Sequence, residues 1–268
     1  MTPESENSRI AGQFLDARRS AGGLDAYPGR LPATLDEAYA IQDEAIQRWQ
    51  RPVIGWKVGL VPSPLSDRFG TDRLAGPIFS PTAARTNGSA VEMPVFAAGF
   101  AAAEAEFLLK IGRAPPAGKV TYSLDETADL IDAVHAGIEI ASSPLRSINE
   151  LGPAAVISDF GNNNGLVVGP EIPHWRSSGF DGWEVSTLID GVPVGSGRAA
   201  ASFPDGAIGA ARFLFALMAR RGIALTAGQW ISSGAVTGVH PVRPGQLVEA
   251  RFREDLVLTC KLVAARPE

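Results

Sequence analysis

Two glutamates separated by one residue, Glu104 and Glu106, lie in the stretch 100–111, FAAAEAEFLLKI, whose other residues are mostly apolar or small. On a β-strand, residues i and i+2 point to the same face, so the two carboxylates would face one point. Phe107 and Leu109 would then face the other side. Two like charges held this close repel each other, so either a cation lies between them or one holds a proton. The alternative is an exposed strand whose glutamates face water.

A third glutamate, Glu139, lies in the stretch 137–141, GIEIA, which is typical of a short strand. Strand alternation places its carboxylate on the face opposite Ile138 and Ile140. With Glu104 and Glu106 it forms a set of three carboxylates on strands. Such a set suits a hard divalent cation, Mg²⁺ or Mn²⁺, and leaves positions open for water and substrate. Zinc is disfavoured, because none of the three histidines is spaced near another His or Cys.

A lysine interrupts another apolar stretch, VIGWKVGL at 53–60. Burying Lys57 costs free energy unless its ammonium group has a partner. The alternative is a surface lysine whose ammonium group reaches water. Gly55 and Gly59 lie two residues to either side and leave space for a ligand, which favours a functional role for Lys57.

The composition indicates a globular protein that binds a small molecule. The chain has 268 residues and 45% hydrophobic residues, enough for one large domain or one domain with an appendage. The net charge of −5 and the lack of any Lys/Arg block argue against nucleic acid or an anionic membrane as partner. A single cysteine, Cys260, excludes an internal disulfide framework and is typical of a core thiol. The first twenty residues lack the apolar segment of a signal peptide, so we expect a cytoplasmic protein.

The pattern of elements before the glutamates predicts two helices, one strand and a long loop. Residues 10–19 have helical spacing, and Thr34 to Glu37 form a capping box for a helix that ends before Pro52. The strand at 53–60 follows. Residues 62–94 are rich in Pro, Gly, Ser, Thr and Asp, which predicts loops with one short strand at 77–79. A loop this long in a compact domain is typical of an active-site cover.

After the glutamates, the pattern predicts more strands than helices. A second capping box at 123–126 predicts a helix running to about His135. Three asparagines between two glycines predict an ordered tight turn at 158–165. The remaining predictions are strands at 155–157, 166–168, 229–233, 247–252 and 257–263, a hairpin at 183–198 around Asp190-Gly191, and a helix at 204–222. The order predicts an α+β fold built on a mostly β core.

Five motifs, in this order, resemble those of 2-keto-4-pentenoate hydratases and 4-oxalocrotonate decarboxylases, within the fumarylacetoacetate hydrolase superfamily. They are GWKVG at 55–59, EAE at 104–106, GIEI at 137–140, SDFGN at 158–162 and SSGAVTG at 232–238. The resemblance covers about residues 34–263. It implies a mixed β-roll of the C-terminal-domain type of that superfamily, with residues 1–60 as an N-terminal helical segment packed on a catalytic domain of residues 61–268.

The resemblance also implies roles for particular residues. Glu104, Glu106 and Glu139 would bind Mg²⁺ or Mn²⁺. Lys57 would act in catalysis and substrate binding, Asp72 and Asp159 in catalysis, and Ser233 and Thr237 in substrate binding. The family is generally oligomeric, which implies a homo-oligomer, and its hydratases and decarboxylases look like complex-forming pairs.

The reaction implied is addition of water to 2-hydroxypenta-2,4-dienoate or a close homologue in meta-cleavage catabolism. Many hydratases read EIxDSR after the third metal ligand, whereas this chain reads EIASSP at 139–144. Relatives that share the metal site are decarboxylases and acylpyruvate hydrolases, and both reactions stay open. A third alternative is a non-catalytic partner subunit that binds metal and keto acid without turnover.

Overall fold

Two β-sheets form the body of the molecule. The computed structural model describes residues 5–79, 83–86, 89–253 and 255–268. Within these ranges the large sheet has the strand order β2-β1-β10-β5-β6-β7-β3, with β11 paired to β5, and the small sheet has the order β4-β13-β12-β8-β9. The large sheet comprises β1 (Val53–Leu60), β2 (Arg73–Phe79), β3 (Ala83–Arg85), β5 (Phe100–Ile111), β6 (Ile131–Ser143), β7 (Asn163–Glu171), β10 (Trp230–Ser232) and β11 (His240–Pro241). The small sheet comprises β4 (Val91–Val95), β8 (Val185–Ile189), β9 (Val192–Gly197), β12 (Leu247–Phe252) and β13 (Leu256–Ala264).

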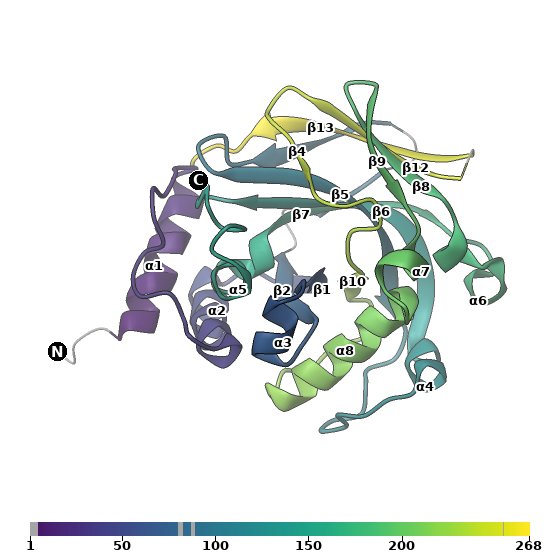
Figure 1. Cartoon of the computed structure of the whole chain (residues 1–268), viewed down its shortest axis with the longest axis horizontal. Helices are drawn as coiled ribbons and strands as arrows, with labels where there is room; N and C mark the ends of the chain where they lie inside the picture. The colour runs from purple at the N-terminus through teal and green to yellow at the C-terminus, as the bar shows by residue number, and fades with distance from the viewer. Residues whose placement is uncertain (1–4, 80–82, 87–88, 254) are drawn as a thin grey trace.

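Most helices lie on the side of the large sheet away from the small sheet (Figure 1). They are α1 (Glu6–Arg19), α2 (Leu35–Trp49), α3 (Leu65–Phe69), α5 (Pro153–Ser158) and α8 (Gly206–Arg220). Three shorter helices are α4 (Leu124–Ala128), α6 (Trp175–Ser178) and α7 (Ala199–Ser202). In the described part of the chain, no helix has both the length and the apolar character needed to span a bilayer.

The N-terminal helices form where the sequence predicted them. The Thr34 hydroxyl accepts a hydrogen bond from the Glu37 N–H and so caps α2. Ile10 and Phe14 of α1 share a buried cluster with Ile41 and Ala45 of α2. This cluster, which also contains Phe79 of β2, therefore holds the two helices to each other and to the large sheet.

The main core lies along the large sheet and extends to the small one. Phe107 of β5 is fully buried and makes edge contacts with Phe180 and Phe252, with ring centroids 4.9 and 5.2 Å apart. Cys260 of β13 is also fully buried in this core. The predicted α+β fold of the mixed β-roll type, with N-terminal helices, is confirmed.

Two predicted elements were wrong. The helix expected to reach His135 ends at Ala128, and β6 begins at Ile131. The capping box is present but fixes only the first turn, because β6 pairs with β5 on one side and β7 on the other. The strand expected at 155–157 is helix α5, which Gly152 (φ 87°) and Pro153 begin.

The segment 62–94 is also more ordered than its composition predicted. It contains α3, β2 and β4, and β2 runs antiparallel to β1 over most of its length. Composition misled here because β2 is an edge strand of the large sheet, paired among the described strands only with β1, and such a strand can accept Gly76 and Pro77. β1 lies within the first sixty residues and pairs with β2 and β10 of the large sheet. The division into two parts at residue 60 stays a prediction.

Candidate metal and substrate site

The three glutamates meet on one face of the central strand pair. Glu104 of β5 lies directly opposite Glu139 of β6 in the antiparallel register, and Glu106 is two residues along β5. Each residue offers a carboxylate oxygen such that these atoms all lie within 4.8 Å of one another. Glu104 is 6% exposed, and Glu106 and Glu139 are fully buried. The alternative of an exposed strand edge is therefore wrong.

Lys57 reaches the same cluster from β1. Its Nζ lies 3.4 Å from Glu139 Oε1, and the residue is 5% exposed. Space for the side chain is made by Gly161, where an added Cβ would lie 3.1 Å from Lys57 Cδ. Lys57 is thus a buried cation with carboxylates as partners, and the alternative of a surface lysine is wrong.

Hydrogen bonds hold two of the carboxylates in place. The Ser232 hydroxyl and the Gly234 N–H both donate to Glu106 Oε2, at 2.5 and 2.9 Å. The Asn163 side-chain amide donates to Glu139 Oε1 at 3.0 Å. The other oxygens, Glu106 Oε1 and Glu139 Oε2, are buried and have no hydrogen-bond partner among the described residues. A buried carboxylate oxygen without a partner is costly, so these two atoms can be stabilised by a bound cation or by a proton.

Burial and mutual repulsion shift the protonation of the cluster. Burial raises the pKa of Glu104 to about 7, against the opposing charge of Lys57. Burial and the carboxylates of Glu139 and Glu104 raise the pKa of Glu106 well above its ordinary value. Burial would lower the pKa of Lys57, but the three carboxylates, Glu139 foremost, outweigh it and raise that pKa. Lys57 is therefore an ammonium ion near neutral pH.

The residues of the cluster fit a hard divalent cation. Three carboxylates and one ammonium group leave an excess of two negative charges when all are ionised. The donors are oxygen atoms, which Mg²⁺ and Mn²⁺ prefer, and the unpartnered oxygens of Glu106 and Glu139 supply free ligand positions. Glu104, Glu106 and Glu139 would hold such an ion.

A cavity of about 510 Å³ opens beside the cluster, with Lys57 and Glu104 in its wall. The wall continues over apolar side chains of β1, α3, β2 and α5, among them Leu60, Leu65 and Leu74. Asn149 and Asn162 are its amide-bearing residues in the described part of the chain. The cavity is large enough for a small carboxylic acid whose charged head lies at Lys57 and the glutamates.

The other predicted site residues do not line this cavity. Asp72 is exposed, and its carboxylate lies 3.6 Å from Arg73 Nη1. The Thr237 hydroxyl bonds the Thr187 hydroxyl at 2.7 Å and the His240 ring at 3.1 Å. Ser233 is buried, with its N–H donating to the Phe107 carbonyl. The loop that carries Ser233 and Thr237 does reach the cavity, through Ala235 and Gly238. Catalytic or substrate-binding roles for Asp72, Ser233 and Thr237 stay predictions.

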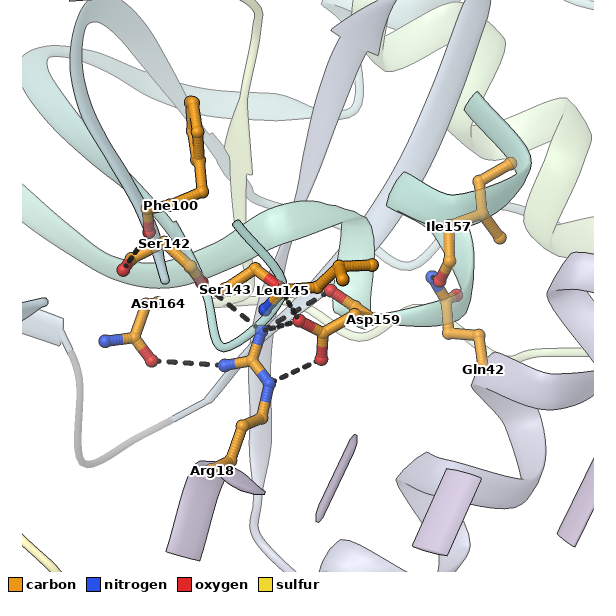
Figure 2. A network of polar contacts seen from close by, with 9 residues as sticks. All are labelled: Arg18, Gln42, Phe100, Ser142, Ser143, Leu145, Ile157, Asp159 and Asn164. Carbon is orange, nitrogen blue, oxygen red and sulfur yellow. Dashed lines mark hydrogen bonds and ion pairs between the residues drawn. The ribbon is translucent and has the colours of Figure 1, made fainter. Parts of the chain in front are cut away.

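Asp159 belongs to a buried network on the other side of the turn at 159–164 (Figure 2). Arg18 of α1 donates to both of its carboxylate oxygens, from Nε at 2.6 Å and from Nη2 at 3.0 Å. Ser143 donates to Asp159 Oδ2 at 2.6 Å, and Arg18 Nη1 donates to Asn164 Oδ1 at 3.1 Å. The guanidinium group also lies over the rings of Phe96 and Phe160, 5.4 and 5.1 Å from their centroids. Asp159 lies outside the cavity wall, and its catalytic role stays a prediction.

The sequence reading missed several residues that the structure places at or behind the site. Ser232 and Asn162 were parts of recognised motifs and Asn163 of the predicted turn, but only the paired strands show which atoms meet. The run of three asparagines predicted a tight turn, and that signal was correct: Asn162 has a left-handed φ of 63°. Arg18 carried no signal, because one arginine in an amphipathic helix is usually exposed.

Comparison with known proteins agrees with the motifs. No protein-family model matches the chain. A curated 2-keto-4-pentenoate hydratase of Paraburkholderia xenovorans strain LB400 is 27% identical over 259 residues, which cover 94% of this chain and 93% of the relative. A 4-oxalocrotonate decarboxylase from Pseudomonas putida G7, complexed with magnesium and adipate, has a similar structure, with a TM-score of 0.82, 19% identity and coverage of 98% and 99%. A fumarylpyruvate hydrolase from Pseudomonas aeruginosa, complexed with Mn²⁺ and pyruvate, aligns with a TM-score of 0.56, 14% identity and coverage of 80% and 91%.

Proposed function

We propose that the chain is a member of the family of 2-keto-4-pentenoate hydratases and 4-oxalocrotonate decarboxylases in the fumarylacetoacetate hydrolase superfamily, and that it is a divalent-metal-dependent hydratase. Its substrate is 2-hydroxypenta-2,4-dienoate or a close homologue, and its metal is Mg²⁺ or Mn²⁺. The observation that carries this proposal is the buried set of Glu104, Glu106 and Glu139 beside Lys57, with two carboxylate oxygens left without partners.

Glu104, Glu106 and Glu139 would hold the divalent ion, which would supply positive charge to stabilise negative charge developing on the substrate. The chain's own residues do the rest. The ammonium group of Lys57, which its raised pKa keeps charged, binds the substrate carboxylate or takes part in proton transfer at carbon. Ser232 and Asn163 hold Glu106 and Glu139 in a fixed orientation, so the site needs little rearrangement.

The hydration reaction takes three steps. The dienol loses its hydroxyl proton and gains one at C5, which gives the 2-oxo-3-enoate. The oxygen of water then bonds to C4, and the C3–C4 π pair moves toward the 2-oxo oxygen. Finally C3 gains a proton and the new hydroxyl loses one, so the product is 4-hydroxy-2-oxopentanoate.

The direct test is turnover. Incubation of the purified chain with 2-hydroxypenta-2,4-dienoate and Mg²⁺ should bleach the dienol absorbance and yield 4-hydroxy-2-oxopentanoate. The reaction should stop in excess EDTA and resume when Mg²⁺ or Mn²⁺ is restored. No turnover of this substrate or of longer homologues would remove the proposal.

Two enzymatic alternatives use the same cluster. Decarboxylation of an oxalocrotonate-type acid forms the enolate by loss of CO₂, and acylpyruvate hydrolysis breaks a C–C bond and gives two acids. Product analysis separates the three reactions. A non-catalytic partner subunit is the remaining alternative, and full activity of the chain purified alone would exclude it. A cytoplasmic location and a complex with a related decarboxylase stay predictions.

A further inference from the structure

The wall of the substrate cavity changes character away from the carboxylate cluster. Its charged residues in the described part of the chain, Lys57 and Glu104, both belong to the cluster itself. The rest of the wall is apolar apart from the amides of Asn149 and Asn162. Apolar wall residues include Leu65, Leu74, Val156 and Phe203. The charged groups that a ligand can contact in the described wall, Lys57 and Glu104, therefore lie at one end of the cavity.

Two wall residues are unusually exposed for their type. Leu60 is 52% exposed and Val239 is 48% exposed, and both line the cavity. The apolar wall of the cavity therefore continues to its solvent-exposed side, where Leu60 and Val239 lie. A ligand tail that reached this side would remove both side chains from water, which is favourable by about 25 cal/mol for each Å² of apolar surface covered.

Arg73, a cation beside the cavity wall, already has partners and is not available to a second anionic group. Arg73 precedes the wall residue Leu74 in β2, and its guanidinium group is bonded to the Asp205 carboxylate. It also lies 4.9 Å from the ring centroid of Phe203, a wall residue. Asp72 also lies 3.6 Å from Arg73 Nη1, while Asp205 is shared with Arg212 at 2.7 Å. The Arg73 guanidinium group thus already has two carboxylates as partners and the Phe203 ring against it. A carboxylate at the tail of a ligand would be desolvated without a partner, which costs several kcal/mol.

The cavity is also larger than a five-carbon acid needs. 2-Hydroxypenta-2,4-dienoate has eight non-hydrogen atoms, and at no more than about 30 Å³ each they would fill roughly 240 Å³. The cavity holds about 510 Å³. About half of its volume therefore stays free beyond the substrate head and its vinyl group.

From these observations, and resting on the proposed function, we propose that the physiological substrate is a 2-oxo or 2-hydroxydienoic acid with one carboxylate and an extended apolar tail. The tail extends past Leu65 and Leu74 to Leu60 and Val239. Acids that carry a second carboxylate at the tail are rejected.

Binding of 2-oxo acids to the Mn²⁺-loaded protein tests this without turnover. We expect affinity in calorimetric titrations to rise about threefold for each methylene from pyruvate to 2-oxooctanoate, more than a hundredfold in total. The dicarboxylic acid of the same length, 2-oxosuberate, should bind no more tightly than pyruvate. A flat series, or 2-oxosuberate binding as tightly as 2-oxooctanoate, would overturn the proposal while the proposed function stands. If pyruvate itself fails to bind, the proposed function fails and this proposal fails with it.

A matched pair of variants locates the tail. Val239→Arg places a cation at the exposed side of the cavity, and Val120→Arg makes the same change at a valine of similar exposure, 45%, outside the cavity wall. Val239→Arg should weaken 2-oxooctanoate binding about tenfold and strengthen 2-oxosuberate binding, with pyruvate unchanged. Val120→Arg should change none of the three, and melting curves check that both variants fold. Equal titrations for the two variants would show that the tail does not reach Val239 and would overturn the proposed extent of the site.

Discussion

At the scale of single residues, the site depends on carboxylates that would repel one another without a cation. Glu106 shows this most clearly, because one of its oxygens accepts two hydrogen bonds and the other, buried as well, has no partner among the described residues. The bonded oxygen fixes the orientation of the group. The second oxygen is then held ready for a ligand, an arrangement that costs stability until an ion binds.

The first prediction concerns Glu106→Gln, which keeps the shape of the side chain and removes one charge. We expect calorimetric titration to show Mn²⁺ binding weakened at least tenfold and most activity lost. The melting temperature in excess EDTA should be retained or raised, because like-charge repulsion falls. Glu92→Gln, at an exposed position on β4, is the matched control and should leave all three measurements unchanged. Equal Mn²⁺ affinities in wild type and Glu106→Gln would exclude Glu106 as a ligand.

The second prediction concerns pH. The folded, metal-free protein holds protons on Glu104 and Glu106 more tightly than the unfolded chain does, because both pKa values are raised, that of Glu104 from 4.5 to about 7. The stabilisation that these two glutamates contribute is therefore fully present below their ordinary pKa of 4.5 and is lost as the pH rises through about 7 and beyond. The raised pKa of Lys57 contributes no change in this window, since Lys57 is protonated throughout in both states. In excess EDTA we expect the melting temperature to fall by several degrees between pH 5.5 and pH 8.

Metal should reverse this dependence. Mn²⁺ competes with the protons of the two glutamates, so its affinity should rise over the same pH interval, with proton release on binding. Calorimetric titrations in buffers of different ionisation enthalpy measure the protons released. A Mn²⁺ affinity that is the same at pH 5.5 and pH 8 would contradict protonated glutamates in the empty site.

At the scale of elements, the turn at 159–164 connects α1 to the carboxylate cluster of Glu104, Glu106 and Glu139. Asn163 donates to Glu139 on one side, while the neighbouring Asn164 accepts from Arg18 on the other. Arg18 and Asp159 form a nearly fully buried ion pair, with side chains 4% and 0% exposed. Removing one partner of such a pair leaves the other charge buried without compensation, and this costs about 3–5 kcal/mol.

The third prediction follows for Arg18→Met, which keeps the length of the side chain and removes the guanidinium group. We expect a large fall in the melting temperature, and a weaker Mn²⁺ affinity because the turn no longer holds Asn163 against Glu139. Arg198→Met is the control, since the Arg198–Glu184 pair is 3.5 Å long and mostly exposed and should contribute less than about 1 kcal/mol. Similar melting temperatures for the two variants would show that the buried network does not stabilise the fold.

The sequence predicted the elements that carry a strong local pattern. The strand with Glu104 and Glu106, the helix capped by Thr34 and the hairpin at Asp190-Gly191 are all present. It failed where partners far along the chain decide the structure. Residues 129–135 were predicted to be helical, but pairing with both β5 and β7 makes β6 a strand.

The candidate site shows the same limit. Spacing alone placed Glu104 and Glu106 on one face, but the register of β5 with β6 is needed to place Glu139 opposite Glu104. Arg18 reaches Asp159 across a separation of 141 residues, and no local pattern predicts such a contact. Long-range pairing, which depends on the whole fold, supplied what the sequence could not.

At the scale of the whole molecule, the small sheet ends in an exposed strand. β9 is the last strand of that sheet, and its Val192 and Val194 are 62% and 40% exposed. An edge strand with exposed valines is a site where another chain can pair. We therefore expect the homo-oligomer that the family resemblance implies to use this edge.

The fourth prediction tests that expectation. Sedimentation of the protein at micromolar concentration should show a species larger than the 28.1 kDa chain. Val194→Lys, which places a charge on the edge, should shift the equilibrium toward monomer, whereas the same change at the exposed Val120 should not. A wild-type protein that sediments only as a monomer would exclude self-association at this concentration.

The buried thiol of Cys260 has one further consequence. Burial raises its pKa to about 12, and its strand β13 is paired on both sides, with Val248 and Val91 opposite Cys260. A thiol-alkylating reagent can therefore modify the native protein only when the small sheet opens. As the chain has a single cysteine, the rate of alkylation would report that opening directly, without any introduced label. We expect this rate to be slow in buffer and to rise steeply with denaturant, and mass spectrometry of the intact chain would measure it.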